Sequence, residues 1–451
     1  MPVAIAWTVN QPTNRTPSAE IIKRFHLVGK QLSGVRSLII SPHCEEDDDY
    51  TDAGNLPIRA LGDIMTINCR TLQHVALRQG LLLTGSEQDY QYTCRCIAET
   101  KQLQSFQMLG CGVFNGDRLL DVESSLTDSL FAALAELPLL GCVELDRMSL
   151  NTPGGLTRFC SNSVTTTPSL KLSNTLPSEQ ELLSMCDHYS RLVKLELCNI
   201  PNINQHIELM ASSLKQNVTT KQLEIHCPRH LSCEEAMPIW NMLEENHGLQ
   251  TMGLALQCSS EYGYKEPMGK ALQKMQSLQQ LHLHLHDANQ TRRLESACFL
   301  LEHLQRNQSL TEFQLCLEEY GESLHDLQCI YTERLNESIA GALQTNATLL
   351  KVSFSINRRT CRTPLSEDVE IWLRYNRAGR RSLELHPEDR QLWVRTILKH
   401  TDDTPIVFQI LMANPALCLS PARTVRSTQR KRKRLLQSFE GGNRSHMQTI
   451  A

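Results

Sequence analysis

Aromatic residues are scarce in this 451-residue chain, where phenylalanine, tyrosine and tryptophan together make up 5%. Its core must therefore be mainly aliphatic, which suits small repeated units better than the aromatic-lined pocket of many enzymes. No apolar run approaches the roughly 18 residues that a membrane-spanning helix needs, so we expect no membrane partner. Met1 to Arg15 also lacks the charged start and apolar core of a secretory signal peptide.

Common catalytic motifs are missing as well. Neither His-Glu-x-x-His nor Gly-x-Ser-x-Gly occurs. The segment Gly263 to Lys270 has five residues between its glycines, whereas a phosphate-binding loop has four. We therefore expect a protein that is not an enzyme and that holds no cofactor and no metal.

The 17 cysteines are odd in number and scattered, which does not suit a framework of disulfides. Many of them, such as Cys142, Cys298 and Cys316, lie within apolar runs. This pattern indicates mostly buried thiols in a reducing compartment. We expect an intracellular protein that is cytoplasmic, nuclear or both.

Charge is unevenly distributed along the chain. The net charge is −4, but the segment from Leu419 onward holds eight Lys/Arg and one Glu, so it carries +7 and the remainder −11. An acidic body makes nucleic acid an improbable partner, because phosphate contacts need a basic face. Within the basic segment, Arg430, Lys431, Arg432, Lys433 and Arg434 form a run typical of nuclear localisation signals, so an import receptor is an expected partner.

One apolar pattern recurs along most of the chain. In it, large apolar residues stand at offsets 0, +3 and +5, and the clearest copy is Leu278, Leu281 and Leu283. Other copies begin at Val35, Leu72, Leu103, Leu140, Leu192, Leu249, Leu310 and Leu349, and weaker ones contain Leu170/Leu172 and Leu223/Ile225. From Leu192 most copies restart after about 28 to 32 residues, which is typical of a long leucine-rich repeat with one strand and one helix per unit.

The segments between these copies have helical spacing of apolar residues. Examples are Ile207 to Leu214 and Leu300 to Leu304. An asparagine follows three residues after a leucine in four of them, at Asn217, Asn246, Asn307 and Asn346. Because asparagine tolerates the left-handed conformation, we expect these residues to end the helices.

The combined pattern Leu-x-x-Asn-x-x-Leu-x-x-Leu-x-Leu resembles the ribonuclease-inhibitor-like leucine-rich repeats, which also occur in tropomodulin C-terminal domains. The resemblance implies an α/β solenoid with parallel strands on the concave face and helices on the convex face. We assign residues 1–34 to an N-terminal segment and 35–360 to the solenoid.

The composition changes after the repeats, where three helices are expected. They are Val369 to Arg380, ending at Gly379, then Gln391 to Lys399 and Pro405 to Met412. This region resembles the C-terminal end of uncharacterised leucine-rich repeat proteins of diatoms, which implies a cap over the open end of the core. We assign residues 361–418 to a helical cap and 419–451 to a disordered basic tail.

Alternation along each strand predicts which residues line the concave face. At offsets +4 and +6 they are acidic in the early repeats, where Glu144, Asp146, Glu196 and Glu224 stand, and His226, His282 and His284 follow later. The seven residues are our candidate partner-binding residues. A solvated surface without a partner is the alternative, and a partner with a basic patch would suit the acidic part.

The histidines that alternate with Leu281 to Leu285 also allow a metal site. Two histidines spaced two apart on a strand can share a zinc ion, and aligning the repeats puts Cys316 beside His284. No carboxylate has the spacing to complete the site, so a histidine-rich polar face is the favoured interpretation. The pair Cys94 and Cys96 lacks a second pair and is interpreted in the same way.

A repeat array with a cap and no catalytic constellation favours a scaffold for protein–protein interaction, whose partner docks on the concave face or its rim. A regulatory or substrate-receptor subunit of an enzyme complex, such as a ubiquitin-ligase adaptor or a small-GTPase regulator, is the alternative. The segment Ile21 to Leu27 is too short to be an F-box.

Overall fold

The computed structural model describes residues 4–9, 34–42, 54–78, 81–109, 112–115, 118–119, 124–147, 149–150, 154–161, 169–187, 189–227, 231–232, 234–257, 265–286, 289–318, 325–356 and 364–417. The chain divides into two compact units, Met1–Leu365 and Ser366–Ala451. The basic run from Arg430 to Arg434 lies outside the described residues.

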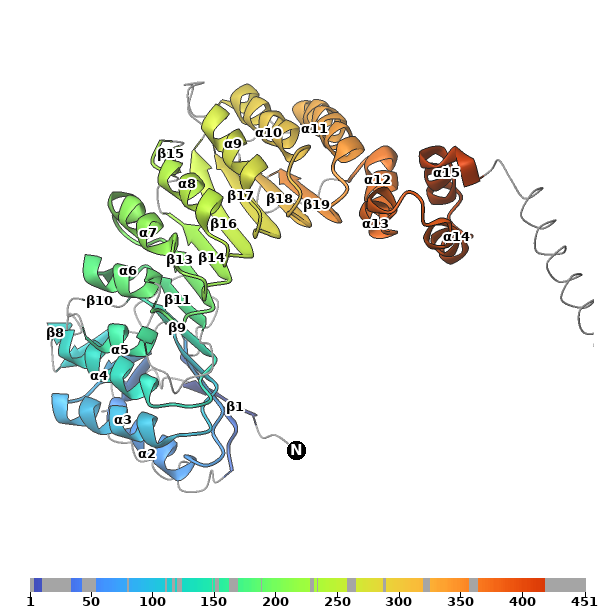
Figure 1. The fold of residues 1–451 in the computed structure, drawn as a ribbon. Helices are drawn as coiled ribbons and strands as arrows, with labels where there is room; N and C mark the ends of the chain where they lie inside the picture. The colour runs from blue at the N-terminus through green and yellow to red at the C-terminus, as the bar shows by residue number, and fades with distance from the viewer. Residues whose placement is uncertain are drawn as a thin grey trace, which may run out of the picture. The chain divides into compact units, whose positions relative to one another are not determined.

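A long parallel sheet forms the body of the first unit (Figure 1). Its strands, in spatial order, are β1 Ala4–Val9, β2 Ser37–Pro42, β4 His74–Leu77, β6 Ser105–Met108, β9 Cys142–Asp146, β11 Ser169–Ser173, β13 Lys194–Cys198, β14 Gln222–His226, β16 Thr251–Gln257, β17 Gln280–His286, β18 Glu312–Glu318 and β19 Lys351–Ile356. Every strand that the apolar pattern predicted is present. The sheet also contains β1, which was expected to be an N-terminal segment outside the repeats and which pairs in parallel with β2.

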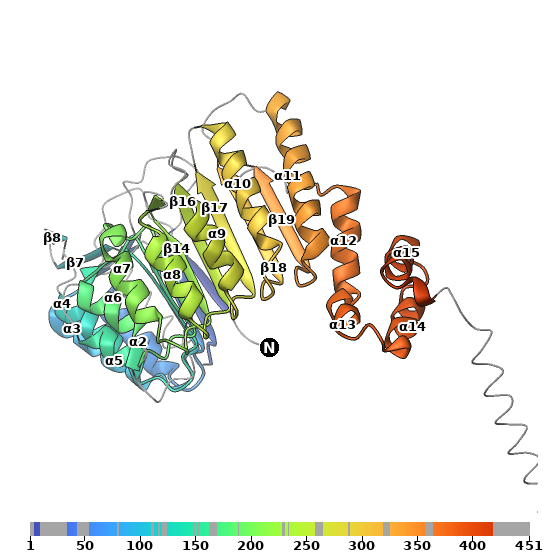
Figure 2. The same ribbon diagram turned by 45° about the horizontal axis from the view of Figure 1, so that its top comes forward.

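Helices cover the convex side of this sheet, so the predicted solenoid is confirmed (Figure 1). They are α2 Ile58–Ile67, α3 Glu87–Glu99, α4 Ser124–Ala135, α5 Gly155–Ser161, α6 Glu179–Cys186, η1 Ile203–His206, α7 Ile207–Leu214, α8 Met237–Glu245, α9 Lys265–Lys274, α10 Gln290–Leu304 and α11 His325–Thr345. Successive helices lie side by side, each against the next, as Figure 2 shows for α6 to α11. Each repeat therefore buries its apolar side against its neighbours.

Short strands link neighbouring repeats at the ends of the main strands. Four of them, β3 Gly54–Pro57, β5 Leu81–Thr84, β7 Gly112–Asn115 and β8 Arg118–Leu119, make a second sheet. A further pair is β10 Ser149–Leu150 with β12 Leu176–Pro177, and β15 Leu231–Ser232 pairs with β16. These strands were not predicted, because segments of two to four residues carry no recognisable periodicity.

Alternation of side chains fixes which face of each strand is buried. On β17, Leu281, Leu283 and Leu285 are at most 1% exposed, whereas His282 and His284 are half-buried on the opposite, concave face. A one-residue slip would exchange the two sets, so these leucines fix the register of β17 with its neighbours β16 and β18.

The recurring asparagines connect one repeat to the next. Asn307 donates its side-chain amide to the carbonyl of Leu272 at 2.6 Å, and its Oδ1 accepts the backbone N–H of Leu310 at 2.7 Å. Asn346 in turn donates to the carbonyls of Leu304 and Asn307. The side chains are buried and their polar atoms satisfied, as burial requires.

The expected left-handed conformation of these asparagines is wrong. Among the described residues other than glycine, positive φ angles occur only at Arg147, Asn174, Asn199 and Asn202. Asn246 has φ −77° and ψ 123°, which is extended backbone. The asparagine is therefore placed by its bonds to the neighbouring repeat, and backbone tolerance is not the reason for its presence.

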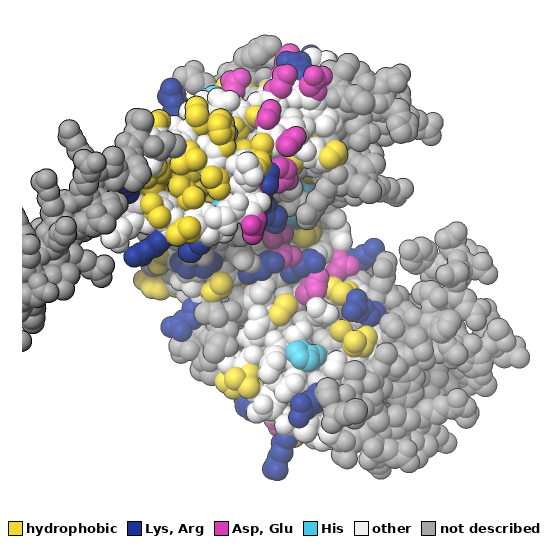
Figure 3. Space-filling view, turned by 90° about the vertical axis from the view of Figure 1, so that its right-hand side faces the viewer, with side chains coloured by type: hydrophobic (Ala, Val, Ile, Leu, Met, Phe, Trp, Pro, Cys, Tyr) yellow, Lys and Arg dark blue, Asp and Glu magenta, His cyan; other side chains and the backbone are white. Residues whose placement is uncertain are grey.

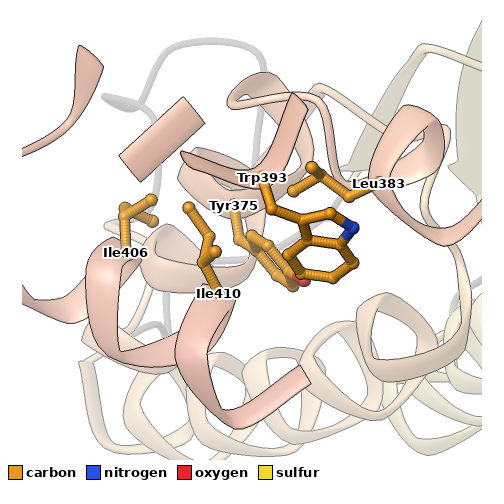
Figure 4. Packing of buried hydrophobic residues seen from close by; sticks show 5 residues of the cluster. All are labelled: Tyr375, Leu383, Trp393, Ile406 and Ile410. Atoms are coloured by element: carbon orange, nitrogen blue, oxygen red, sulfur yellow. The ribbon is translucent and has the colours of Figure 1, made fainter. Parts of the chain in front are cut away.

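The second unit is a small helical assembly. It contains α12 Glu367–Arg377, α13 Arg380–Leu385, α14 Arg390–Lys399, α15 Thr404–Ala413 and η3 Pro415–Leu417. Its core is made by Tyr375, Leu383, Trp393, Ile406 and Ile410, which point into the space between the helices (Figure 4).

Three of these helices, α12, α14 and α15, match the expected segments. Gly379 has φ +100° and separates α12 from α13, which was not expected as a separate helix. In the parts of the chain that the structure describes, no helix is both long and apolar enough to cross a membrane.

Candidate functional site

The register of the sheet aligns one polar row across the concave face. From β6 to β19, successive partners in this row are Gln107, Glu144, Lys171, Glu196, Glu224, Gly253, His282, Gln314 and Ser353. Neighbouring strands lie about 4.8 Å apart, so side chains of adjacent members reach one another. The row brings together Glu144, Glu196, Glu224 and His282 of the candidate residues.

The early part of the row is a ladder of ion pairs. Lys171 Nζ lies 2.6 Å from Glu144 and 3.8 Å from Glu196, and Gln107 donates to Glu144 at 3.1 Å. The hydrogen bond to Glu144 raises the pKa of Lys171 above its usual value. The ammonium group therefore stays charged at neutral pH and fixes two carboxylates on different strands.

Lys194, on the same face of β13 as Glu196, extends the ladder. It is paired with Glu196 and lies 3.8 Å from Glu224. Burial alone would lower the pKa of Lys194, but the hydrogen bond to Glu196 and the neighbouring carboxylates raise it. A hydrogen bond from His226, followed by the charge of Lys194, lowers the pKa of Glu224 below its usual value.

We name Glu144, Lys171, Lys194, Glu196 and Glu224 the charge ladder. Its three carboxylates and two ammonium groups give a net charge of −1, so the face is less acidic than the carboxylates alone indicated. Lys194 was not among the candidates because only offsets +4 and +6 were considered. It stands at +2, which alternation places on the same face.

Asp146 lies outside the ladder, at the end of β9. Its carboxylate accepts a hydrogen bond from the Asn174 side chain at 2.6 Å and lies 3.7 Å from Arg147. Arg147 directly follows β9 and Asn174 directly follows β11, and both have positive φ angles because the chain turns sharply there. The structure therefore gives Asp146 a role in joining two turns, in addition to the partner contact predicted for it.

The histidines gather around β16. His226 and His284 meet edge to face, with ring centroids 5.6 Å apart, although their strands are separated by β16. Ala255 pairs with His284, and Cys316 stands opposite His284 on the other side, which confirms the predicted alignment of the repeats. The small side chain of Ala255 leaves the space in which the two rings approach each other.

Gly253, two residues before Ala255 on the same face of β16, also leaves space for a side chain from the neighbouring strand. A Cβ atom at Gly253 would lie 3.0 Å from Cγ of Glu224, so the Glu224 side chain occupies the space over this glycine. Glu224 therefore approaches His282 from across β16, and its pKa is lowered in part by that ring. Two small residues on one strand thus join the charge ladder to the histidines.

This cluster is a polar surface in the structure. Among the residues that the structure describes, no group of three or more His, Cys, Asp and Glu side chains could hold a metal ion.

Cys94 and Cys96 lie on helix α3, where residues two apart face different directions. Burial raises the pKa of the Cys94 thiol to about 12, and Cys96 accepts a hydrogen bond from Thr66.

Neither a protein-family model nor a curated protein matches this chain. Among solved structures, the chain is similar to "Leiomodin-1 Actin-Binding Site 2 (ABS2)", with 18% identity and a TM-score of 0.28, over 48% of this chain and 98% of that one. It is also similar to the tropomodulin C-terminal domain of Caenorhabditis elegans, with 14% identity and a TM-score of 0.25, over 46% of this chain and 98% of that one.

Proposed function

We propose that this protein is a non-enzymatic scaffold that binds a protein partner on the concave face of its solenoid. The observation that carries the proposal is the polar row, which continues from β6 to β19 on the side of the sheet opposite the helices. A partner would contact the seven candidate residues together with Lys171 and Lys194.

The charge ladder supports this proposal because its side chains are fixed before a partner arrives. Its side chains are 16–35% exposed and paired with one another within and across strands, so little side-chain freedom is left to lose on binding. An ordered pattern of both charges gives specificity, since a partner must present the complementary order. The net charge of −1 favours a partner whose docking surface is basic.

The experiment begins with crosslinking mass spectrometry on the affinity-purified protein from its native cells, with and without residues 419–451. We expect one partner whose crosslinks lie along the strands. Crosslinks confined to import receptors through the tail would contradict the proposal.

Two double variants then test the concave face against the convex one. Glu144→Gln with Lys171→Gln removes one rung of the charge ladder and leaves the net charge unchanged. Lys215→Gln with Glu245→Gln does the same to a pair at the C-terminal ends of α7 and α8, where Lys215 directly follows α7 and the charged atoms are 3.0 Å apart. We expect the affinity for the partner to fall at least tenfold in the first variant and less than twofold in the second, because ion pairs at an interface outweigh exposed pairs elsewhere.

Equal affinities in the two variants would refute docking at the charge ladder. Circular dichroism and thermal unfolding of each variant check that the solenoid is intact, so that a lost fold is not mistaken for lost binding.

A further inference from the structure

The C-terminal unit exposes large apolar side chains on two neighbouring helices. On α14, Val394 and Leu398 are 42% and 66% exposed, and on α15, Phe408 and Met412 are 59% and 61% exposed. We name these four residues the cap patch. Figure 3, which faces the C-terminal unit, shows apolar side chains gathered on its surface.

The spacing of these residues places the exposed side chains of each helix on one side of it. Each helix contributes a pair four residues apart, which places both members on one side of that helix. The core of the unit uses other positions, Trp393 on α14 and Ile406 and Ile410 on α15. Both helices therefore carry a second apolar surface, of the kind that marks a binding site.

The chain itself supplies a segment with a matching apolar pattern, a short way along the sequence from this surface. The described chain ends in η3, where Leu417 packs against the core of the C-terminal unit, and 34 residues follow. Among them Leu435, Leu436 and Phe439 stand at i, i+1 and i+4, the spacing of one apolar side of a helical turn. They directly follow the basic run that ends at Arg434.

The connecting segment is long enough to allow this contact. Seventeen residues separate Leu417 from Leu435, and such a segment can span about 55 Å. A helix of ten residues, such as α14 or α15, is only about 15 Å long.

A tethered segment also has an advantage over any second molecule. A docking segment on the same chain, joined through a short connection, has an effective concentration on the order of millimolar, whereas a second copy or a partner at micromolar concentration competes poorly. We propose that Leu435, Leu436 and Phe439 dock on the cap patch of the same molecule and hold the basic run against the C-terminal unit. This inference is independent of binding at the charge ladder.

Photo-crosslinking of the full chain tests the proposal. With p-benzoylphenylalanine in place of Phe439, we expect products of monomer mass, mapped by mass spectrometry to α14 and α15. The yield should fall at least fivefold when Phe408→Asp and Met412→Asp are added. It should not change with Tyr189→Asp and Val218→Asp, two residues of the first unit that are 69% and 62% exposed.

A reciprocal experiment protects the test against unfolding of the C-terminal unit. The photo-crosslinker is then placed at Met412, and Leu435, Leu436 and Phe439 are changed to serine, which leaves the helices untouched. We expect loss of the crosslink to the tail. Products of dimer mass would assign the cap patch to a second copy and overturn the proposal, as would tail crosslinks that persist in either variant set or map away from α14 and α15.

Discussion

Two glutamates that each accept the backbone N–H of a serine three residues earlier have pKa values shifted in opposite directions. Glu181 accepts the backbone N–H of Ser178 at 2.9 Å before α6, and Glu235 accepts that of Ser232 at 2.8 Å before α8. Glu181 is 2% exposed, and burial raises its pKa to about 7. The hydrogen bond from Asn204, followed by that from Ser232, lowers the pKa of Glu235.

The pKa of Glu181 leads to a prediction for Glu181→Gln. Because the folded pKa lies above the unfolded value of about 4.5, the wild type loses stability relative to the variant as the pH rises through 7. Glutamine keeps the capping hydrogen bond without a charge. Urea unfolding at pH 5 and pH 8 should show similar stabilities at pH 5 and an advantage of roughly 2–3 kcal/mol for the variant at pH 8.

Glu235→Gln is the matched control. Its folded pKa is lowered, so ionised Glu235 contributes stability above its unfolded pKa and loses it as the pH falls through the folded value. We expect this variant to have a lower urea midpoint than the wild type at pH 8, with the difference shrinking in acid. If the two variants respond to pH in the same direction, the assignment of burial as the cause for Glu181 is wrong.

For individual residues, the sequence predicted positions but not the contacts between side chains. The Leu-x-x-Asn motif located Asn217 and Asn307 correctly, because its period is visible in the chain. Their hydrogen bonds to the preceding repeat could not be inferred, since those bonds depend on how closely repeats stack. Lys171 and Lys194 were visible in the sequence, but their pairing with two carboxylates each depends on the register across three strands.

At the scale of elements, the strands were predicted best. Leucines at fixed offsets predicted eleven strands of the main sheet and their common register, because one buried face fixes both. The first strand, Ala4–Val9, has no leucine and was missed. The short linking strands were missed because they have no sequence pattern of their own. They form only where neighbouring loops pair with each other.

The packing between repeats leads to a second prediction. A Cβ atom at Gly248 would lie 2.6 Å from Cα of Val218 in the preceding repeat, so the two backbones touch there. Gly248→Ala must push the repeats apart and should cost about 1–3 kcal/mol of unfolding free energy. Chemical denaturation measures the loss.

The same substitution elsewhere should have the opposite effect. Gly341 lies inside α11, and among the described residues no atom apart from the nearby backbone of the helix itself stands within 4 Å of a Cβ placed there. Gly341→Ala should therefore stabilise the protein by roughly 0.5–1 kcal/mol, since alanine has the higher helix propensity. A neutral Gly248→Ala would mean that the repeats can separate locally without loss.

At the scale of the whole molecule, the chain separates its charges. The segment from Leu419 carries +7, whereas the rest carries −11. Composition alone predicted this division, because it needs no knowledge of the fold. The exposed apolar residues of the cap patch could not be predicted, since α14 and α15 contain apolar residues on several sides and only packing decides which of them are buried.

The basic run leads to the last prediction, which concerns where the protein resides. Five consecutive cations give a high density of positive charge, which suits an acidic partner such as an import receptor. Changing Arg430 to Arg434 to alanine should therefore lower the nuclear fraction of a fluorescent fusion in native cells severalfold. Arg430→Lys, Arg432→Lys and Arg434→Lys together keep all five charges and should leave that fraction unchanged. An unchanged nuclear fraction in the alanine variant would mean that the run is not a nuclear localisation signal. The comparison isolates charge, because the lysine variant keeps it and the alanine variant removes it.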